Sequence, residues 1–191
     1  DDALAWRPRA DGGLTLALGS AHDFFIGPEA FRQFLTWLPL ARSTFANTRF
    51  RLASPPGWPD AWAQRRHWND AGPSPFEAMR VLDPAPNPDF VERIARLFAE
   101  RFPALGKPAI THAWAGLIDS MPDVVPVVDV VADLPGLVVA TGMSGHGFGI
   151  GPAFGRIVAD LVTGRAPGHD LARFRLSRFS DGSRLETGPA L

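Results

Sequence analysis

Cysteine and tyrosine do not occur in this chain of 191 residues. Without cysteine, the chain cannot form a disulfide, a thiolate metal site, a cysteine nucleophile or a cysteinyl link to a cofactor. The lack of tyrosine excludes a phenol as a catalytic acid or a substrate clamp. Long apolar runs are also missing. Two prolines and two aspartates interrupt the richest stretch, 124–140, so no transmembrane helix is expected.

Charge of either sign is nearly balanced, with 19 Lys and Arg against 20 Asp and Glu. This balance offers no basic surface to a nucleic acid or an anionic membrane. Apolar residues make up 46% of the chain, enough for the core of a globular domain, and 19 glycines and 19 prolines predict many turns. No secretory signal is visible, so a cytoplasmic protein is expected.

The first half of the chain predicts several short elements. Residues 4–9 and 14–18 alternate in polarity around an Asp-Gly pair, which is typical of a β-hairpin. A helix is expected over 28–42, opened by a proline, and a strand over 44–53. Residues 54–88, rich in proline and tryptophan, predict a long packed loop with short helical turns.

The second half begins with the clearest helical pattern of the chain. It runs over 88–102 and ends at Pro103. Strands are predicted over 109–118, 124–131 and 137–140. The last of these is almost wholly apolar, so it is expected to be buried on both faces.

A glycine-rich turn, 142–151, separates the last strand from a helix predicted over 152–164. Glycine lets a backbone approach a ligand closely, and a helix N-terminus offers N–H groups and partial positive charge. The turn therefore suits a phosphate, a carboxylate or an electron-rich ring carbonyl. Its spacing contains no G-x-G-x-x-G, and no strand follows the helix. We interpret it as the closing strand and helix of an α/β layer, either with a ligand at the turn or with none.

Two other constellations suggest chemistry. Ser144 lies on a strand-to-helix turn, but the nucleophile elbow of hydrolases needs G-x-S-x-G, and a histidine occupies the last position here. His22 and Asp23 suggest a dyad or a pair of metal ligands. No third ligand has a suitable spacing, so no metal site is expected and a hydrogen bond within a loop is the better interpretation.

Several motifs occur in an order that resembles one protein family. They are Trp114-Ala115-Gly116-Leu117, Met121-Pro122-Asp123, Gly142-x-Ser144-Gly145-His146-Gly147-Phe148, Asp160-Leu161, Thr163-Gly164, Phe174-Arg175 and Arg178-Phe179. Residues 109–181 are thereby similar to the C-terminal half of the D-amino-acid oxidase-type FAD-dependent oxidoreductases, which include glycine and sarcosine oxidases and D-amino-acid dehydrogenases. Residues 4–108 fit the family more loosely.

The resemblance implies a fold and a domain organisation. Chains of this family open with a strand, a dinucleotide fingerprint and a helix that hold the FAD diphosphate, so an N-terminal half is expected to be missing here. Residues 1–123 would form part of an antiparallel-sheet substrate domain, of the α+β class. Residues 124–191 would form the closing part of a Rossmann-type α/β FAD-binding domain. An isolated half exposes apolar surface, which favours self-association.

The resemblance also implies a reaction. The C–N bond of an amine or amino acid would be oxidised, with hydride passing to flavin N5 and the imine hydrolysing later. Backbone amides and the helix dipole would stabilise negative charge at the flavin N1–C2=O edge. The residues expected to contact FAD are Gly142, Met143, Ser144, Gly145, His146, Gly147, Phe148 and Gly149. Because cysteine is absent, FAD would be held non-covalently, and a chain without the diphosphate site can lack it altogether.

Two positions depart from the family pattern. Ile118 stands where glycine-oxidase-like members place an arginine for the substrate carboxylate, and Gly149 stands where sarcosine-oxidase-like members place a lysine. Arg49, Arg51 or Arg80 could supply a replacement charge, and so could a residue on the missing half. We predict that Arg51 and His146 bind the substrate, and we assign no catalytic side chain.

A second hypothesis comes from a different class of protein. The chain would then be a non-enzymatic α/β domain that binds a small anion at the glycine-rich turn. A yellow chromophore on the native protein would separate the flavoenzyme hypothesis from this one.

Overall fold

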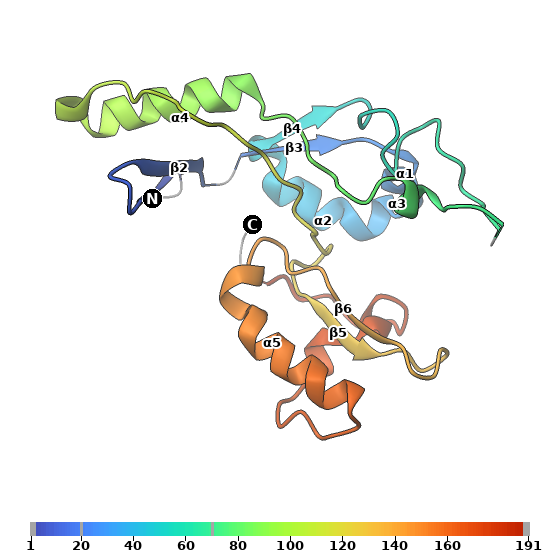
Figure 1. The fold of residues 1–191 in the computed structure, drawn as a ribbon. Helices are drawn as coiled ribbons and strands as arrows, with labels where there is room; N and C mark the ends of the chain where they lie inside the picture. Colours follow the sequence, from blue (N-terminus) through green and yellow to red (C-terminus); the bar gives the residue numbers. More distant parts are fainter. Residues whose placement is uncertain (1–2, 20, 70, 189–191) are drawn as a thin grey trace. The chain divides into compact units, whose positions relative to one another are not determined.

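The computed structural model describes residues 3–19, 21–69 and 71–188, which form two compact units, 1–117 and 118–191 (Figure 1). Each unit is described by itself below. The division predicted at residue 123 was drawn from the expected roles of the two parts and stays a prediction.

The first unit opens with the hairpin that the sequence predicts. Strands β1 (Leu4–Pro8) and β2 (Leu14–Leu18) pair antiparallel. The turn between them closes because Gly12 adopts a φ of +83° and the carboxylate of Asp11 accepts the backbone N–H of Gly13 at 3.0 Å. Both features follow from the Asp-Gly pair.

The next two strands are parallel, which the sequence did not indicate. Strand β3 (His22–Phe25) pairs with β4 (Thr48–Arg51) across a helical crossover. The crossover consists of α1 (Pro28–Arg32), α2 (Phe34–Thr44) and the short 3-10 helix η1 (Phe45–Asn47). The predicted helix is therefore broken, and the first part of the predicted strand is helical. The expectation of an antiparallel sheet is wrong for β3 and β4, because strands joined by a long helical connection can lie parallel.

The remainder of the first unit is a loop, one long helix and the short 3-10 helix η2 (Pro103–Leu105). The loop carries α3 (Pro75–Ala78), whose capping box joins Ser74 and Glu77. Helix α4 (Pro88–Arg101) has Asn87 as its N-cap and ends before a proline, as predicted. Its buried face includes Phe98, and it contacts both strands of the hairpin.

The strand predicted over 109–118 does not form. Within the described residues, this segment pairs with no other strand. Its large apolar side chains at Ile110, Trp114 and Leu117 are about half exposed or more. Alternating polarity makes a segment suitable for a sheet, but a strand also needs a neighbouring backbone edge with which to exchange hydrogen bonds. The prediction was therefore wrong for lack of a partner.

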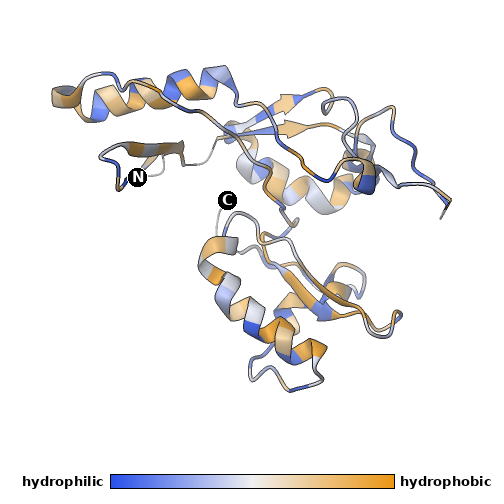
Figure 2. Cartoon of the chain, in the orientation of Figure 1, coloured by the Kyte–Doolittle hydropathy of each residue, from blue (hydrophilic) through white to orange (hydrophobic). Residues whose placement is uncertain are grey.

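The second unit packs one helix on a two-stranded sheet. Strands β5 (Val127–Val130) and β6 (Val138–Thr141) pair antiparallel, and α5 (Gly147–Val162) contacts both of them. Hydrophobic and hydrophilic residues both occur along α5 (Figure 2). Its apolar side chains Phe154 and Ile157 pack with Val128 of the sheet to form the core. Two 3-10 helices, η3 (Ala172–Phe174) and η4 (Leu176–Phe179), follow α5.

Two expectations for the second unit need correction. Helix α5 begins at Gly147, five residues before the predicted start at Pro152. Glycine has a low helix propensity, yet packing of Ile150 and Phe154 in the core extends the helix through this stretch. Strand β6 is not buried on both faces, because Ala140 is exposed and the other three residues of β6 are only partly buried. The sheet has only two strands, so most of β6 stays accessible.

Candidate functional site

The turn between β6 and α5 follows an unusual backbone path. Gly142, Ser144 and Gly145 all have positive φ, at +71°, +48° and +82°. A positive φ is ordinary for glycine and costly for serine. The N–H of His146 then bonds to the carbonyl of Met143 at 2.8 Å, and the helix begins at the next residue.

Ser144 is held in this conformation by its own hydroxyl. The side chain is 1% exposed, and its Oγ donates to the carbonyl of Gly142 and accepts the N–H of Met121, both at 3.1 Å. A buried hydroxyl engaged in this way cannot reach a substrate. The geometry therefore agrees with setting aside a serine hydrolase.

Two glycines after Ser144, Gly145 and Gly149, leave open space beside the backbone, whereas a Cβ at Gly147 would lie 3.3 Å from that of Met143. A Cβ added at Gly149 would meet nothing within 4 Å, and one at Gly145 would reach only Ile118 at 4.0 Å. The N–H groups of Gly147 and Phe148 lie in the first turn of α5, where an α-helix provides no acceptor of its own. The turn thus combines accessible backbone, amide donors and the positive end of a 16-residue helix. This donor set fits the electron-rich edge of a flavin ring.

The eight residues predicted to bind FAD differ in what they expose. Met143 packs against the core of the second unit, and Ser144 is buried. His146 is half-buried at the N-cap of α5, whereas the Phe148 ring is fully exposed. Direct contact with a flavin is therefore available to the backbone and to His146 and Phe148, but not to the hydroxyl of Ser144.

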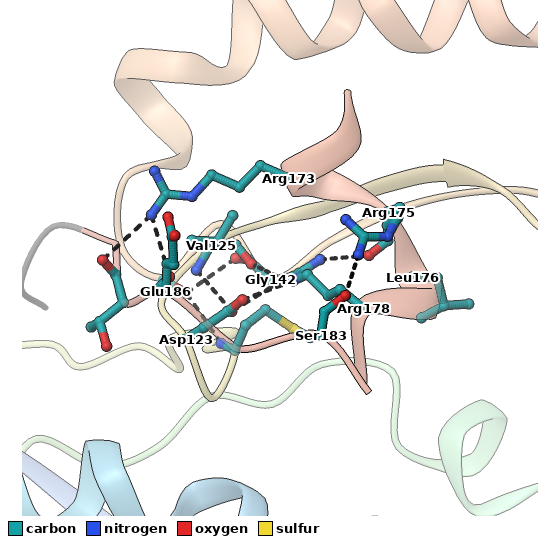
Figure 3. Close-up of polar contacts among 12 residues, drawn as sticks. Asp123, Val125, Gly142, Arg173, Arg175, Leu176, Arg178, Ser183 and Glu186 are labelled. Carbon is teal, nitrogen blue, oxygen red and sulfur yellow. Dashed lines mark hydrogen bonds and ion pairs between the residues drawn. The ribbon is translucent and has the colours of Figure 1, made fainter. Parts of the chain in front are cut away.

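Two aspartates, Asp119 and Asp123, hold the segment that precedes the sheet, and Figure 3 shows the contacts of Asp123. The carboxylate of Asp119 accepts the N–H of Gly142 at 2.6 Å and the hydroxyl of Thr141 at 2.5 Å. The carboxylate of Asp123 forms a buried ion pair with Arg178. The partners lie 22 to 55 residues apart in the chain, so no local pattern reveals them.

The predicted substrate residue Arg51 lies in the first unit. Its Nε bonds to the carboxylate of Asp23 at 3.3 Å, and the amide of Asn87 bonds to the same carboxylate at 3.0 Å. The Arg51 side chain is 38% exposed, so part of the guanidinium stays accessible. His22 lies on β3 rather than in a loop, and its Nε2 is 2.9 Å from the hydroxyl of Thr48.

The two other candidate arginines and the three loop tryptophans lie in surroundings different from those of Arg51. Arg49 pairs with Asp89, and Arg80 is exposed. The carboxylate of Asp89 raises the pKa of Arg49 through a hydrogen bond. Each loop tryptophan packs against one phenylalanine, with ring centroids 5.6 to 5.9 Å apart. These pairs are Trp58 with Phe25, Trp62 with Phe31, and Trp68 with Phe76.

The part of the chain that the structure describes offers neither a metal-binding cluster nor a membrane-spanning helix. Over residues 3–19, 21–69 and 71–188, no three His, Asp or Glu side chains gather in a way that could hold a metal ion. None of the described helices is long and apolar enough to cross a membrane.

The fold and the glycine-rich turn define a class of protein. The family model described as FAD dependent oxidoreductase (DAO) matches residues 6–161, so the chain belongs to this FAD-dependent family. The resemblance predicted from the sequence motifs is confirmed, and so is FAD as the cofactor of the family.

This chain matches only part of each of two curated relatives. An N-methyl-L-tryptophan oxidase of Salmonella newport (strain SL254) is 41% identical over 87 residues, which cover 43% of this chain and 23% of the relative. The corresponding protein of Salmonella arizonae is 40% identical over the same length. The chain therefore spans about a quarter of the length of these curated relatives.

Solved structures extend the likeness to nearly the whole chain. An L-amino acid deaminase from Proteus vulgaris matches with a TM-score of 0.79 and 26% identity, over 93% of this chain and 40% of that one. The L-amino acid deaminase of Proteus myxofaciens, solved in complex with anthranilate, matches with a TM-score of 0.81 over 94% of this chain and 39% of that one. Its 24% identity supports the fold alone.

Proposed function

We propose that this chain forms part of an FAD-dependent oxidoreductase that oxidises a C–N bond of an amine or amino acid. Hydride would leave the carbon that bears the nitrogen, and the resulting imine would hydrolyse. FAD supplies the two-electron acceptor, at its N5 atom. The observation that carries the proposal is the start of α5, where open glycine backbone precedes two amide donors.

The chain's own contribution is electrostatic. The amides of Gly147 and Phe148, with the positive end of the α5 dipole, stabilise negative charge placed at the N-terminus of the helix. Gly145 and Gly149 keep side chains out of the space through which a flat ring approaches. This role needs backbone and not an acidic or basic side chain, which is why no catalytic side chain is assigned.

Two side chains are proposed to contact the substrate. The partly exposed guanidinium of Arg51 offers a charge to a carboxylate, and His146 lies directly before the amide donors. The relatives include an N-methyl-L-tryptophan oxidase and L-amino acid deaminases, whose names indicate nitrogen-bearing substrates with a carboxylate. A secondary or primary amino acid is therefore the proposed substrate class.

The domain roles follow from the same proposal. Residues 1–123 would contribute to the substrate domain and residues 124–191 to the FAD-binding domain. Membership of an FAD-dependent family favours this proposal over a non-enzymatic domain that binds a small anion.

The test compares two glycines of α5 in the purified protein that carries this chain. A Cβ meets nothing within 4 Å at either Gly149 or Gly155, and leucine is the better helix former at both positions. Only Gly149 lies in the first turn. Gly149→Leu should lower the FAD content and slow anaerobic bleaching by N-methyl-L-tryptophan and other amino acids, whereas Gly155→Leu should match the wild type.

Three results would contradict the proposal. One is a wild-type protein without flavin absorbance. Another is bound flavin that no amine or amino acid bleaches under anaerobic conditions. The third is equal behaviour of the two leucine variants. Acid precipitation of the wild type should also release the FAD into solution, because the chain has no cysteine to bind it covalently.

A further inference from the structure

Asp119 contacts the end of β6 and the glycine-rich turn through three hydrogen bonds, at Thr141, Gly142 and Ser144. Its Oδ2 accepts the N–H of Gly142 at 2.6 Å and the hydroxyl of Thr141 at 2.5 Å. Its backbone carbonyl accepts the N–H of Ser144 at 2.9 Å. One residue therefore fixes the end of β6 and the first part of the turn.

Two further contacts join Met121 to the glycine-rich turn. The hydroxyl of Ser144 accepts the N–H of Met121, two residues after Asp119. A Cβ at Gly142 would lie 2.1 Å from Cγ of Met121, so the Met121 side chain packs directly on the glycine backbone. The segment 119–121 and the turn 141–144 thus hold each other through hydrogen bonds and close packing.

This contact maintains a strained conformation. Ser144 has a φ of +48°, which is unfavourable for a residue with a Cβ. Such a conformation persists only where the surroundings determine it. Here the N–H of Ser144 bonds to the carbonyl of Asp119, and its hydroxyl bonds on both sides.

The position of the turn decides where α5 begins. Only Gly145 and His146 separate Ser144 from the first helical residue. Further along, Phe154 and Ile157 anchor the helix in the core. The first-turn amides are therefore held on both sides along the chain. The core fixes the helix on their C-terminal side, and the Asp119 contact fixes the turn on their N-terminal side.

We infer that Asp119 is a positioning residue, which holds the glycine-rich turn so that the first amides of α5 face the flavin; this inference rests on the proposed function. Asp119 acts through Gly142 and Ser144 and itself donates nothing to the cofactor. Its negative charge has the wrong sign to stabilise a reduced, anionic flavin. If Asp119 acts by positioning the amides, its removal lowers the flavin reduction potential. If it acts through its charge, its removal raises that potential.

The test uses three variants of the purified protein that carries this chain. Asp119→Ala removes both side-chain contacts, whereas Asp119→Asn removes the charge and keeps an oxygen acceptor. Asp129→Ala is the matched control, because the Asp129 carboxylate also accepts two hydrogen bonds, in its case from the backbone N–H groups of Val130 and Leu176, both at 2.8 Å. Asp129 lies on β5 and pairs with Val139, two residues before Thr141 on β6.

Two measurements are made on each variant. The first is amide hydrogen exchange over 140–150 in flavin-free protein, where Asp119→Ala should exchange about tenfold faster, as expected for one lost hydrogen bond to a charged group. The second is the flavin reduction potential. Asp119→Ala should lower this potential, because the displaced amides stabilise the negative charge less well. Asp119→Asn, which loses only the charge, should not fall below the wild-type value, and Asp129→Ala should stay near it.

The outcomes separate the inference from the proposed function. Unchanged exchange in Asp119→Ala would overturn the positioning role, whatever the flavin does. Faster exchange with an unchanged potential would show that the contact is merely structural and would also overturn it. A rise in potential in both Asp119 variants would assign the effect to charge and contradict the inference. If the wild type binds no flavin, the proposed function fails and the role of Asp119 toward flavin fails with it.

Discussion

Arg178 donates two hydrogen bonds to the carboxylate of Asp123, 55 residues earlier in the chain, from Nε at 2.7 Å and from Nη2 at 3.1 Å. The two side chains are only 4% and 3% exposed. Arg178 also donates to the carbonyls of Val125 and Arg175, and Asp123 accepts the N–H of Val125. The pair is thus almost fully satisfied, and it ties the segment after α5 to the turn before β5.

Breaking this pair should destabilise the second unit strongly. Arg178→Met leaves the carboxylate of Asp123 buried without its cation, which typically costs about 3–5 kcal/mol. Urea denaturation measures the loss. Arg165→Met is the control, because the Arg165 side chain is 67% exposed, so water screens its pair with Asp160 and the loss should be about 1 kcal/mol. Equal losses in the two variants would show that burial does not set the strength of the Asp123 pair.

Asn87 connects the N-terminus of α4 to strand β3. Its Oδ1 accepts the N–H of Asp89, as an N-cap does, while its Nδ2 donates to Asp23 at 3.0 Å. Asn87→Asp keeps the cap, since both residue types are good N-caps, but it places a second carboxylate beside Asp23. The variant should be less stable than the wild type at pH 7, because like charges this close repel each other.

The pH dependence of this variant gives the decisive measurement. The introduced carboxyl lies beside a like charge, which favours its protonated form, so it takes up a proton as the pH falls and can then donate the lost hydrogen bond. The stability deficit should therefore shrink at acidic pH in urea titrations. Asn87→Ala, the control, loses cap and donor together and should show a deficit that acid does not reduce.

Asp181 provides a second pH-dependent contact. Hydrogen bonds from Ser183, together with Arg175, lower the pKa of Asp181 to about 2. A folded-state pKa below the unfolded value of 3.8 favours the folded state above that value, and this contribution is lost as the pH falls toward 2. NMR titration should show the carboxyl of Asp181 still ionised at pH 3. A midpoint near 4 would contradict the contact with Ser183, and Asp181→Asn should remove the pH dependence.

Local signals explain which elements of the fold could be predicted. The Asp11-Gly12 pair specifies the turn of the first hairpin, and a capping asparagine and a following proline bound α4. The start of α5 was missed because Gly147 and Gly149 have low helix propensity, whereas core packing of Phe154 is not visible in a local pattern.

The contacts of the site could not be predicted for a related reason. The glycine-rich turn was identified by its composition, but the left-handed Ser144 depends on partners at Asp119 and Met121, more than twenty residues away. Arg178 belongs to a motif that carried the family resemblance, yet nothing local identifies Asp123 as its partner. Composition thus singled out the turn as a candidate site, and only the fold supplied its supporting contacts.

The proposed role of Arg51 predicts a change in substrate affinity. If its guanidinium binds the substrate carboxylate, Arg51→Met should raise KM for an amino acid about tenfold or more, with kcat nearly unchanged. A neutral amine of similar shape should show no such rise. Arg32→Met is the control, since Arg32 also pairs with a carboxylate, that of Glu29. Equal effects on the acid and the neutral amine would exclude Arg51 as the carboxylate partner.

Alanine substitutions at Gly142 and Gly136 distinguish the cost of backbone strain from the cost of a steric clash. Both have positive φ, +71° and +90°, but an added Cβ meets nothing within 4 Å at Gly136 and would lie 2.1 Å from Met121 at Gly142. Gly136→Ala should cost only about 1–2 kcal/mol of left-handed strain. Gly142→Ala should cost about 1–3 kcal/mol more, because Met121 must move. Denaturation curves measure both losses, and adding Met121→Ala to Gly142→Ala should recover stability only if the clash is its cause.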